Sequence, residues 1–338
     1  MIELSHLAQP LSIGGVALPN RVFLAPMSGV TDMPFRMRAV QHGAGLVVAE
    51  MVASGELAKG RGTSGLRIRR PDVPVHMVQL AGREAVAMAE AARIAEGEGA
   101  DVIDINMGCP AKKVTGGYCG SALMREPDHA VSLIDAVVGA VNVPVTVKMR
   151  LGWDESSLNA PELARRAEQS GVRMVTVHGR TRCQFYNGRA DWRAIARVKA
   201  AVGIPVVANG DVSSVADAAD ILRQSGADAV MVGRAAYGAP WLPGAIARQA
   251  AGLCVEGEPS GAVLADYVAA HYEDMLSLYG VESGLRQARK HLGWYLDVHA
   301  AECGPALRST VLRSTDPAEV VAALRLAFAG GDKLRKAA

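Results

Sequence analysis

Eight short apolar segments recur in the first 234 residues, and each is followed by a loop and an alanine-rich stretch of helical spacing. Runs that are apolar on both faces are typical of strands buried in a parallel sheet. Eight such units within roughly 250 residues predict a (β/α)8 TIM barrel. The segments are VFLAP (22–26), LVVAE (46–50), VHMVQL (75–80), DVIDIN (101–106), VPVTVKM (143–149), MVTVHG (174–179), IPVVANG (204–210) and AVMVGR (229–234).

A doubly wound open sheet is the alternative arrangement for the same alternation of strands and helices. That fold normally carries a glycine-rich phosphate-binding turn directly after its first strand, whereas LAPMSGVTD follows here. The spacing GxGxxG does occur in GRGTSG (60–65), but no strand leads into it and the following LRIRRPD is not expected to open a helix. We therefore expect a flexible, basic surface loop at this point.

The strand pattern stops after residue 244. Residues 245–338 contain amphipathic stretches separated by Gly- and Pro-rich breaks, among them VLADYVAAHYEDMLSLYG and GLRQARKHLGWYLDVHA. We expect two domains, a barrel over residues 1–244 and a small all-helical domain over residues 245–338.

Composition excludes several classes of protein. The net charge is +2, and acidic residues are about as many as basic ones in 245–338, so the totals give no support for a nucleic-acid partner. The five cysteines are scattered and form no CxxC pair, so neither a disulfide framework nor a metal site is expected. Without a signal peptide or a long apolar run, the expected protein is cytoplasmic and not membrane-bound. We expect a monomer.

Polar residues follow nearly every predicted strand. The catalytic residues of a TIM barrel lie at the carboxyl ends of its strands, and a barrel that served only as a scaffold would not need so many polar groups there. The candidate site residues are Met27, Ser28, Glu50, Gln79, Asn106, Cys109, Lys148, Arg150, His178, Arg180, Asn209, Asp211, Gly233 and Arg234.

The turns ANGD (208–211) and VGR (232–234) follow the last two strands, where many barrels bind a phosphate through backbone N–H groups. With no dinucleotide-binding motif elsewhere, the predicted cofactor is FMN; alternatively, the glycines only allow tight turns. Lys148 ends a buried strand, where its ammonium can stabilise the N1/C2=O edge of a reduced flavin. The alternative is a structural ion pair, for example with Glu50.

Cys109 comes directly after the fourth strand in NMGCPAKKV. An unperturbed thiol, with a pKa of about 8.5, is mostly protonated at neutral pH and can donate a proton to a substrate. Alternatively, Cys109 is a small buried apolar residue. Cys119, in the same loop, is the competing candidate. His178 and Arg180 in VHGRT form a cationic pair suited to a phosphate or a substrate carbonyl, unless His178 is a core residue.

Seven ordered segments resemble the tRNA-dihydrouridine synthases, specifically the bacterial B-type group. They are APMSGVTDMPFR (25–36), VQLAG (78–82), DINMGCPAKKV (104–114), VPVTVKMRLGW (143–153), TVHGRTR (176–182), VVANGDV (206–212) and VMVGRAAYGAPW (230–241), and ARKHLGWYL (288–296) extends the match into the helical domain. Ser28 departs from the alanine that is common there, and Cys119 is not required by the family.

The resemblance implies a flavoenzyme in which NADPH, or NADH, reduces FMN. Hydride then passes to C6 of a tRNA D-loop uridine, while Cys109 as the catalytic acid protonates C5. Asn106 and Arg180 would contact the substrate. The implied FMN-binding residues are Pro26, Met27, Ser28, Gln79, Lys148, His178, Asn209, Gly210, Asp211, Gly233 and Arg234.

The helical domain would contact tRNA through Arg286, Arg289 and Lys290, which share one helix face by their spacing. An ordinary solvated face is the alternative. Two other functions stay open: an FMN-dependent dehydrogenase of a free pyrimidine, of the dihydroorotate or dihydropyrimidine type, and a non-catalytic flavin-bearing RNA-binding regulator.

Overall fold

The computed structural model describes residues 4–60, 64–254 and 258–329. The chain forms two compact units, Met1–Ala235 with Trp241–Cys254, and Ala236–Pro240 with Val255–Ala338. Helix α10 (Leu242–Ala250) therefore belongs to the first unit, whereas the sequence placed the boundary at residue 244. The reason lies at Gly244, where an added Cβ would stand 1.9 Å from the carbonyl oxygen of His42. Such close backbone approach fixes α10 on the first unit.

The first unit is the predicted barrel. Its nine strands are all parallel, in the order β4-β3-β11-β10-β9-β8-β7-β6-β5. An isolated parallel bridge between Val48, directly after β4, and Met77 of β6 closes the sheet. The strands are β3 (Val22–Leu24), β4 (Leu46–Val47), β5 (Val52–Ala53), β6 (Met77–Ala81), β7 (Val102–Met107), β8 (Val145–Arg150), β9 (Met174–His178), β10 (Val206–Asn209) and β11 (Ala229–Val232).

All eight predicted strands are present, but the second is interrupted. Its position in the barrel is shared by β4, the bridge at Val48 and the short β5. The segment after it also differs from the expected loop, because Ser64–Ile68 forms helix α3, with Ser64 and Ile68 buried. The expectation that this stretch opens no helix was wrong; residues 61–63 of the glycine-rich loop lie outside the described residues.

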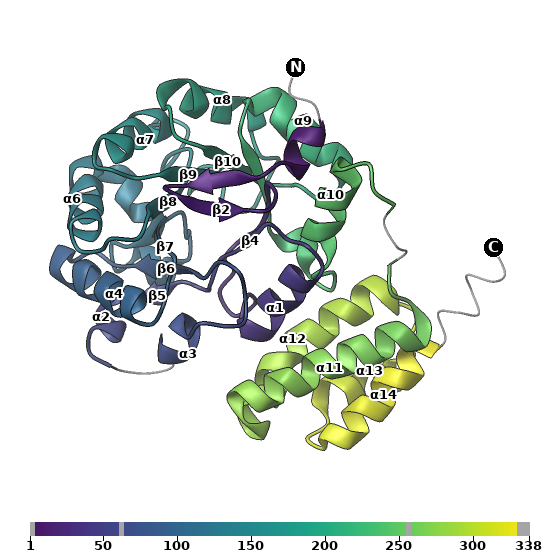
Figure 1. Cartoon of the computed structure of the whole chain (residues 1–338). Helices are drawn as coiled ribbons and strands as arrows, with labels where there is room; N and C mark the ends of the chain where they lie inside the picture. Colours follow the sequence, from purple (N-terminus) through teal and green to yellow (C-terminus); the bar gives the residue numbers. More distant parts are fainter. Residues whose placement is uncertain (1–3, 61–63, 255–257, 330–338) are drawn as a thin grey trace. The chain divides into compact units, whose positions relative to one another are not determined.

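Helices surround the strands in Figure 1. Their burial follows the 3.6-residue period, as in α4, where Met88, Ala91, Ala92 and Ala95 face the sheet. Asp32, Asp191 and Ser214 cap the helices that follow them. The helices are η1 (Leu4–Ala8), α1 (Met33–Gln41), α2 (Ser54–Leu57), α4 (Ala85–Gly97), α5 (Lys112–Thr115), η2 (Gly120–Arg125), α6 (Pro127–Val138), α7 (Ala160–Gln169), α8 (Trp192–Ala201), α9 (Val215–Ser225) and η3 (Arg234–Ala236).

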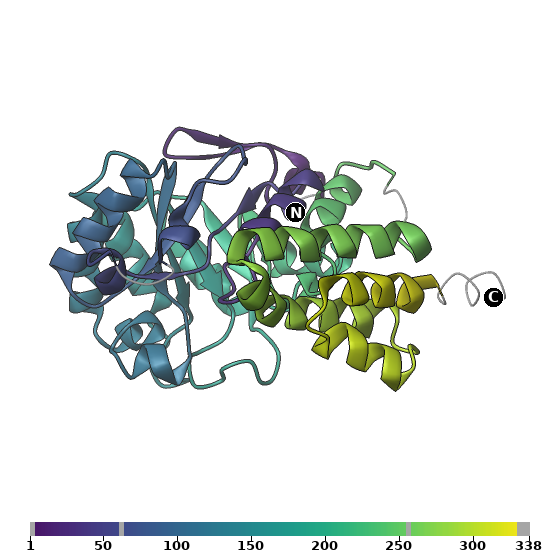
Figure 2. The ribbon, with the colours of Figure 1, turned by 90° about the horizontal axis from the view of Figure 1, so that it is seen from below.

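An antiparallel hairpin that the sequence analysis did not anticipate covers the amino end of the barrel. It consists of β1 (Leu11–Ile13) and β2 (Val16–Leu18). Ile13 and Leu18 pack in one cluster with residues from the inner face of the strands, including Phe23. In Figure 2 the purple hairpin lies at one end of the barrel, and teal loops extend from the opposite end. The amino end is thus filled by side chains, so a site must lie at the carboxyl end.

The inner face of the barrel changes character along the strands. Toward the amino end its residues are apolar and join the hairpin cluster, as Val102 and Met174 do. Two and four positions further along, the same strands carry polar side chains on the same face, because side chains alternate in direction along a strand. These inner polar residues are Gln79, Asp104, Asn106, Thr146, Lys148, Thr176, His178 and Asn209.

The second unit is helical, as predicted. It contains α11 (Gly261–Tyr279), α12 (Val281–His299), α13 (Pro305–Arg313) and α14 (Pro317–Ala329). The segment Ala236–Pro240 joins it through Tyr237, whose ring stacks on Trp294 with centroids 4.0 Å apart. Helix α13 was not among the predicted helices. No described helix is long and apolar enough to span a membrane.

Candidate active site

Strand register brings polar residues of the inner face together, among them the predicted site residues Gln79, Asn106, Lys148, His178 and Asn209. Gln79, Asp104 and Thr146 are register partners on β6, β7 and β8. One layer further along, Asn106 pairs with Lys148, and His178 on β9 pairs with Asn209 on β10. Register partners in a parallel sheet point to the same side, so these side chains form two adjacent polar layers.

Lys148 lies among other polar side chains at this end. Its Nζ donates to Asn209 Oδ1 at 3.1 Å, and Asn209 Nδ2 donates in turn to the carbonyl oxygen of Met231 at 2.8 Å. Burial, and secondarily the charge of Arg150, lower the Lys148 pKa to about 8. The ammonium is therefore held in a defined position, charged at neutral pH but easily discharged above it.

Glu50 does not pair with Lys148. Its Oε2 accepts from the backbone N–H of Gly29 at 2.7 Å and lies 3.5 Å from Nε of Arg67. Among the described residues, Lys148 forms no ion pair with Glu50 or another acid within 4.0 Å, so the structural ion pair considered as its alternative role is not seen there. Glu50 instead holds the loop after β3, which contains the predicted cofactor residues Pro26, Met27 and Ser28.

A chain of hydrogen bonds leads from the middle of β7 to the turn that carries Cys109. Asp104 accepts from Gln79 Nε2 at 2.7 Å and from Thr146 Oγ1 at 2.6 Å. Gln79 Oε1 accepts from Asn106 Nδ2 at 2.8 Å. Asn106 Oδ1 then accepts from the backbone N–H groups of Gly108, at 3.1 Å, and Cys109, at 2.9 Å.

Cys109 is partly exposed, and its backbone is held from several directions. Its carbonyl oxygen accepts from both the N–H and the hydroxyl of Ser121, and Arg150 Nε donates to the carbonyl oxygen of Gly108 at 2.8 Å. Cys119 has a different environment: its thiol donates to the carbonyl oxygen of Gly117, and burial raises its pKa. The geometry thus favours Cys109 over Cys119 as the residue presented to a substrate.

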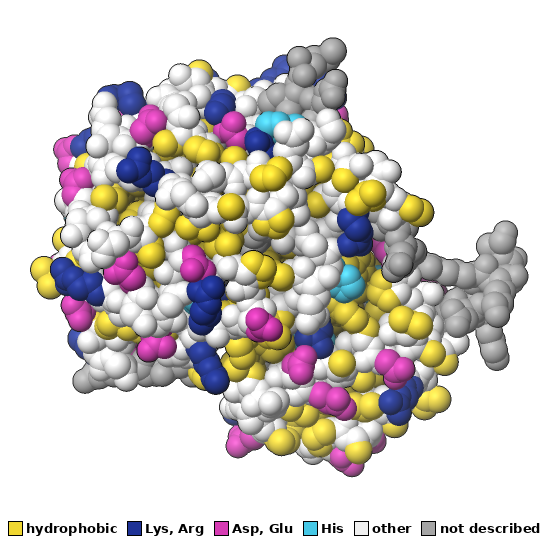
Figure 3. All heavy atoms as spheres, viewed as in Figure 1, with side chains coloured by type: hydrophobic (Ala, Val, Ile, Leu, Met, Phe, Trp, Pro, Cys, Tyr) yellow, Lys and Arg dark blue, Asp and Glu magenta, His cyan; other side chains and the backbone are white. Residues whose placement is uncertain are grey.

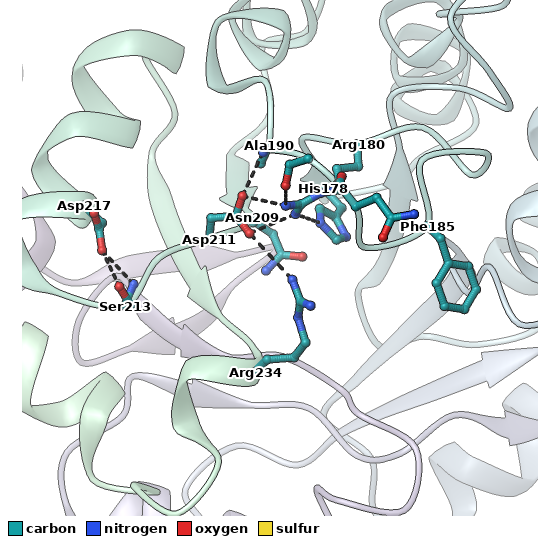
Figure 4. Close-up of polar contacts among 12 residues, drawn as sticks. His178, Arg180, Phe185, Ala190, Asn209, Asp211, Ser213, Asp217 and Arg234 are labelled. Atoms are coloured by element: carbon teal, nitrogen blue, oxygen red, sulfur yellow. Dashed lines mark hydrogen bonds and ion pairs between the residues drawn. The ribbon is translucent and has the colours of Figure 1, made fainter. Parts of the chain in front are cut away.

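Arg180 is 2% exposed and is clamped in place (Figure 4). It binds both carboxylate oxygens of Asp211, at 2.9 and 2.7 Å, and the carbonyl oxygens of Asn187 and Gly188, while its Nη1 lies 3.3 Å from His178 Nε2. These contacts engage all five N–H groups of the guanidinium. The geometry favours a loop-positioning role for Arg180 over the substrate contact expected from the sequence.

The charges and hydrogen bonds around Arg180 shift the pKa values of His178 and Asp211. Burial and the neighbouring cations, Lys148 first among them, lower the His178 pKa well below its usual value, so the imidazole is neutral. Burial alone raises the Asp211 pKa, but the hydrogen bonds from Arg180 and from the Ala190 N–H outweigh it, and the net shift is downward. Asp211 also adopts a left-handed φ of 57°, a strained conformation that these bonds hold.

The two glycine turns after β10 and β11 differ. At Gly210, with φ 123°, an added Cβ would lie 2.8 Å from the Cβ of Ala190, so glycine is required there by the protein itself. At Gly233 the nearest atom to an added Cβ is 4.0 Å away, so packing does not require glycine. Arg234, half-exposed, lies 3.6 Å from Asp211 Oδ1. The open backbone at Gly233 beside a cation suits an anionic group.

A pair of aromatic residues beside the site was not among the residues predicted from the sequence. Phe185 and Tyr186 follow β9, with rings edge to face at 4.8 Å, and Tyr186 is 41% exposed. The Tyr186 ring lies 4.6 Å from the guanidinium carbon of Arg234 and 5.5 Å from that of Arg150. The dipeptide in QFYN, in a chain with only 4% aromatic residues, was the available signal.

A third aromatic residue after β8 was also missed. Trp153 is flanked by Arg125, at 4.2 Å from its ring centroid, and by Arg182, at 4.7 Å.

Within the described part of the chain, no group of three or more His, Cys, Asp or Glu residues could hold a metal ion.

The predicted basic cluster lies apart from these residues in sequence, on α12 of the second unit. Arg286 and Arg289 are exposed on α12, and Lys290 is partly buried. Arg286 pairs with Glu282 at 2.7 Å, and Lys290 Nζ donates to Gln287 at 3.1 Å. On the face seen in Figure 3, basic and acidic side chains of the first unit are interspersed, in keeping with the near-neutral total.

A closed parallel barrel with a lysine, a neutral histidine and a cysteine at the carboxyl ends of its strands defines a TIM-barrel enzyme. Solved structures share this fold at low sequence identity. Histamine dehydrogenase from Rhizobium sp. 4-9 matches with a TM-score of 0.57 and 15% identity, covering 74% of this chain and 48% of that one. Morphinone reductase in complex with tetrahydroNAD matches with a TM-score of 0.53 and 16% identity, covering 76% and 93%.

The family model for dihydrouridine synthase (Dus) matches residues 23–330. A probable tRNA-dihydrouridine synthase from Rhizobium leguminosarum bv. phaseoli is 57% identical over 316 residues, covering 94% of this chain and 98% of that protein. A tRNA-dihydrouridine synthase B from Xanthomonas axonopodis pv. citri is 47% identical over 308 residues, covering 91% and 92%. The chain belongs to the dihydrouridine synthase family, which confirms the resemblance found in the sequence.

Proposed function

We propose that the protein is a flavin-dependent tRNA-dihydrouridine synthase that uses FMN, reduced by NADPH or NADH, to convert a D-loop uridine of tRNA to 5,6-dihydrouridine. The observation that carries the proposal is the arrangement of Cys109 and Lys148. A thiol held by its backbone and an ammonium held by Asn209 lie at the same end of a barrel whose other end is filled.

The residues present fit FMN. Gly233 leaves its backbone open, and Arg234 supplies a cation for the phosphate. The Lys148 ammonium and the Gln79 amide can face the N1/C2=O edge of the flavin ring. The remaining proposed contacts are with Pro26, Met27, Ser28, His178, Asn209, Gly210 and Asp211. Bound and reduced, the flavin would supply hydride to C6 of uracil.

Cys109 supplies the proton in the proposed reaction. Its S–H bond breaks and a C–H bond forms at C5, so that hydride at C6 and a proton at C5 together saturate the C5=C6 bond. Asn106 uses one Nδ2–H for Gln79 and keeps the second for the uracil. Tyr186, partly exposed and next to two arginines, offers a stacking surface for an extruded base.

Both units would contact the tRNA. On the first, the FMN-binding and catalytic unit, Trp153 with Arg125 and Arg182 combines an aromatic face with two cations, as single-stranded RNA sites do. On the second, Arg286, Arg289 and Lys290 are proposed to contact phosphates. The protein is proposed to act in the cytoplasm as a monomer.

The test is the dihydrouridine content of unmodified tRNA after incubation with FMN-loaded protein and NADPH. Cys109→Ala should lower product formation by about 10²- to 10⁴-fold, the usual contribution of a general acid. Cys119→Ala is the matched control from the same loop and should keep activity within about twofold of wild type. Absence of product on any tRNA, with NADPH oxidised in the presence of a free pyrimidine, would instead identify a small-molecule dehydrogenase.

A further inference from the structure

Asp104 is a buried carboxylate to which the proposed reaction assigns no role. It lies in the middle of β7, 2% exposed, two residues before Asn106 on the same face of the strand. Its hydrogen-bond partners are neutral, Gln79 on β6 and Thr146 on β8, and Lys148 is the charged group nearby on β8. Burying a carboxylate in such surroundings costs free energy of folding, so its position needs a physical reason.

The reason lies in the direction that a carboxylate imposes on neighbouring amides. An ionised carboxylate only accepts hydrogen bonds, so Gln79 must turn its NH2 group toward Asp104. The Gln79 oxygen then faces Asn106 and accepts from its NH2 group. The Asn106 oxygen thereby faces the N–H groups of Gly108 and Cys109 and accepts a hydrogen bond from each. Rotating either amide would bring two donors or two acceptors face to face, so the carboxylate at one end and the backbone N–H groups at the other permit one orientation of the pair.

We propose that Asp104 is a positioning residue that fixes the orientation of the Gln79 and Asn106 amides, and through them the turn presenting Cys109. Gln79 and Asn106 each keep one N–H group for a ligand. The same carboxylate therefore determines that the flavin and the uracil would face hydrogen-bond donors at these two positions. This role rests on the proposed function, whereas the orientation itself is a property of the chain alone.

The charge state of Asp104 controls this orientation. Burial raises its pKa to about 6, although the bonds from Gln79 and Thr146 and the charge of Lys148 work against that shift. The carboxylate is ionised above pH 6 and protonated below it. A protonated Asp104 can donate to the Gln79 oxygen, which lets Gln79 rotate and turn its NH2 group toward the oxygen of Asn106. That oxygen is then drawn away from the two backbone N–H groups.

The direct measurement is amide hydrogen exchange in the peptide containing Gly108 and Cys109, using flavin-loaded protein without substrate. In wild type, protection relative to intrinsic exchange should fall by on the order of tenfold as pH drops through about 6. In Asp104→Asn, which replaces one accepting oxygen with a donating amide of the same shape, protection should already be low at pH 7.5 and independent of pH.

Thr146→Val is the matched control. It removes one bond to the ionised form but keeps the carboxylate, so the transition should persist and move to higher pH. The rate of dihydrouridine formation should depend on pH in the same way. In wild type it should fall as pH drops through about 6, and in Thr146→Val the fall should occur at higher pH. In Asp104→Asn the rate should show no such fall, and kcat should be lowered about tenfold.

The outcomes separate the two proposals. Constant protection of Gly108 and Cys109 in wild type between pH 5 and 7.5 would overturn the role of Asp104, even if Asp104→Asn does not fold. Protection that changes as described in a protein that makes no dihydrouridine would overturn the proposed function and leave the positioning role standing.

Discussion

The inner face of the barrel and the outer face of α12 both concentrate polar side chains, but they hold them differently. Lys148, Asn106 and Asp104 come from neighbouring strands whose register fixes their partners. Arg286 and Lys290 form hydrogen bonds with residues three or four positions away on their own helix. In the first case removing one group leaves another buried and unsatisfied, whereas in the second water replaces it.

This difference teaches where sequence changes should matter. Exposed ion pairs within a helix contribute about 0.3–0.5 kcal/mol and are screened by salt, whereas a buried group with one defined partner is costly to remove. Substitutions in the barrel should therefore change chemistry or folding, and those on α12 should change only the electrostatic attraction of RNA.

Lys148→Met should have the largest effect. The change keeps the length of the side chain but removes the charge proposed to stabilise reduced flavin, so we expect kcat to fall on the order of 10²-fold. In wild type, the ammonium loses its proton as pH rises through its pKa of about 8, so the turnover rate should decline there. The rate of flavin reduction by NADPH from pH 7 to 9.5, a step in which Cys109 takes no part, should show that decline in wild type and not in Lys148→Met; a decline of equal size in both would contradict the assignment.

Arg180→Leu should mainly affect stability. It removes the donor to the carbonyl oxygens of Asn187 and Gly188 and leaves Asp211 with only the Ala190 N–H and the more distant Arg234. Breaking such a buried pair costs about 3–5 kcal/mol, toward the low end because Asp211 is partly exposed. Denaturant unfolding measures this loss. Arg223→Ala, which breaks an exposed pair with Asp220, is the control and should change stability by less than about 0.5 kcal/mol. Comparable losses in the two variants would remove the distinction between buried and exposed pairs.

The double substitution Arg286→Ala and Lys290→Ala should have the smallest effect. We expect the affinity for tRNA at low salt to fall by about tenfold or less. The slope of log affinity against log salt concentration should become shallower by about 1–2. Filter binding between 50 and 300 mM salt tests this, with Arg325→Ala on α14 as an exposed control of the same type. Unchanged binding at every salt concentration would leave the α12 cluster as an ordinary solvated face.

Much of the barrel could be predicted because its signals are local. Each strand is a short apolar run. His178 and Asn209 end their strands and Lys148 lies two residues before the end of β8, near the edge where the fold places its site. The hairpin β1–β2 escaped prediction because three-residue strands carry little pattern, and Ile13 and Leu18 become core residues only through contacts with distant strands. Helix α13 escaped because its apolar face is short, with Val311 its only buried residue.

The roles of individual side chains were harder to predict than their positions. Arg180 was correctly placed at a strand end, but a sequence cannot say whether the donors of a guanidinium are already used by the protein. Asp104 was overlooked because it stands mid-strand, where strand-end reasoning does not look. Its spacing of two residues from Asn106 was the available clue, since that spacing places both on one face.

Among the described residues, the hairpin β1–β2 covers the amino end of the barrel. Ile13 and Leu18 fill that end, so any molecule that reaches Lys148 and Cys109 must arrive and leave past the loops at the carboxyl end. The two substrates of the proposed reaction, a nicotinamide nucleotide and a tRNA, would therefore both approach from the carboxyl end of the strands. Because both would approach the flavin from the same end, we expect the reductant to leave before the RNA binds.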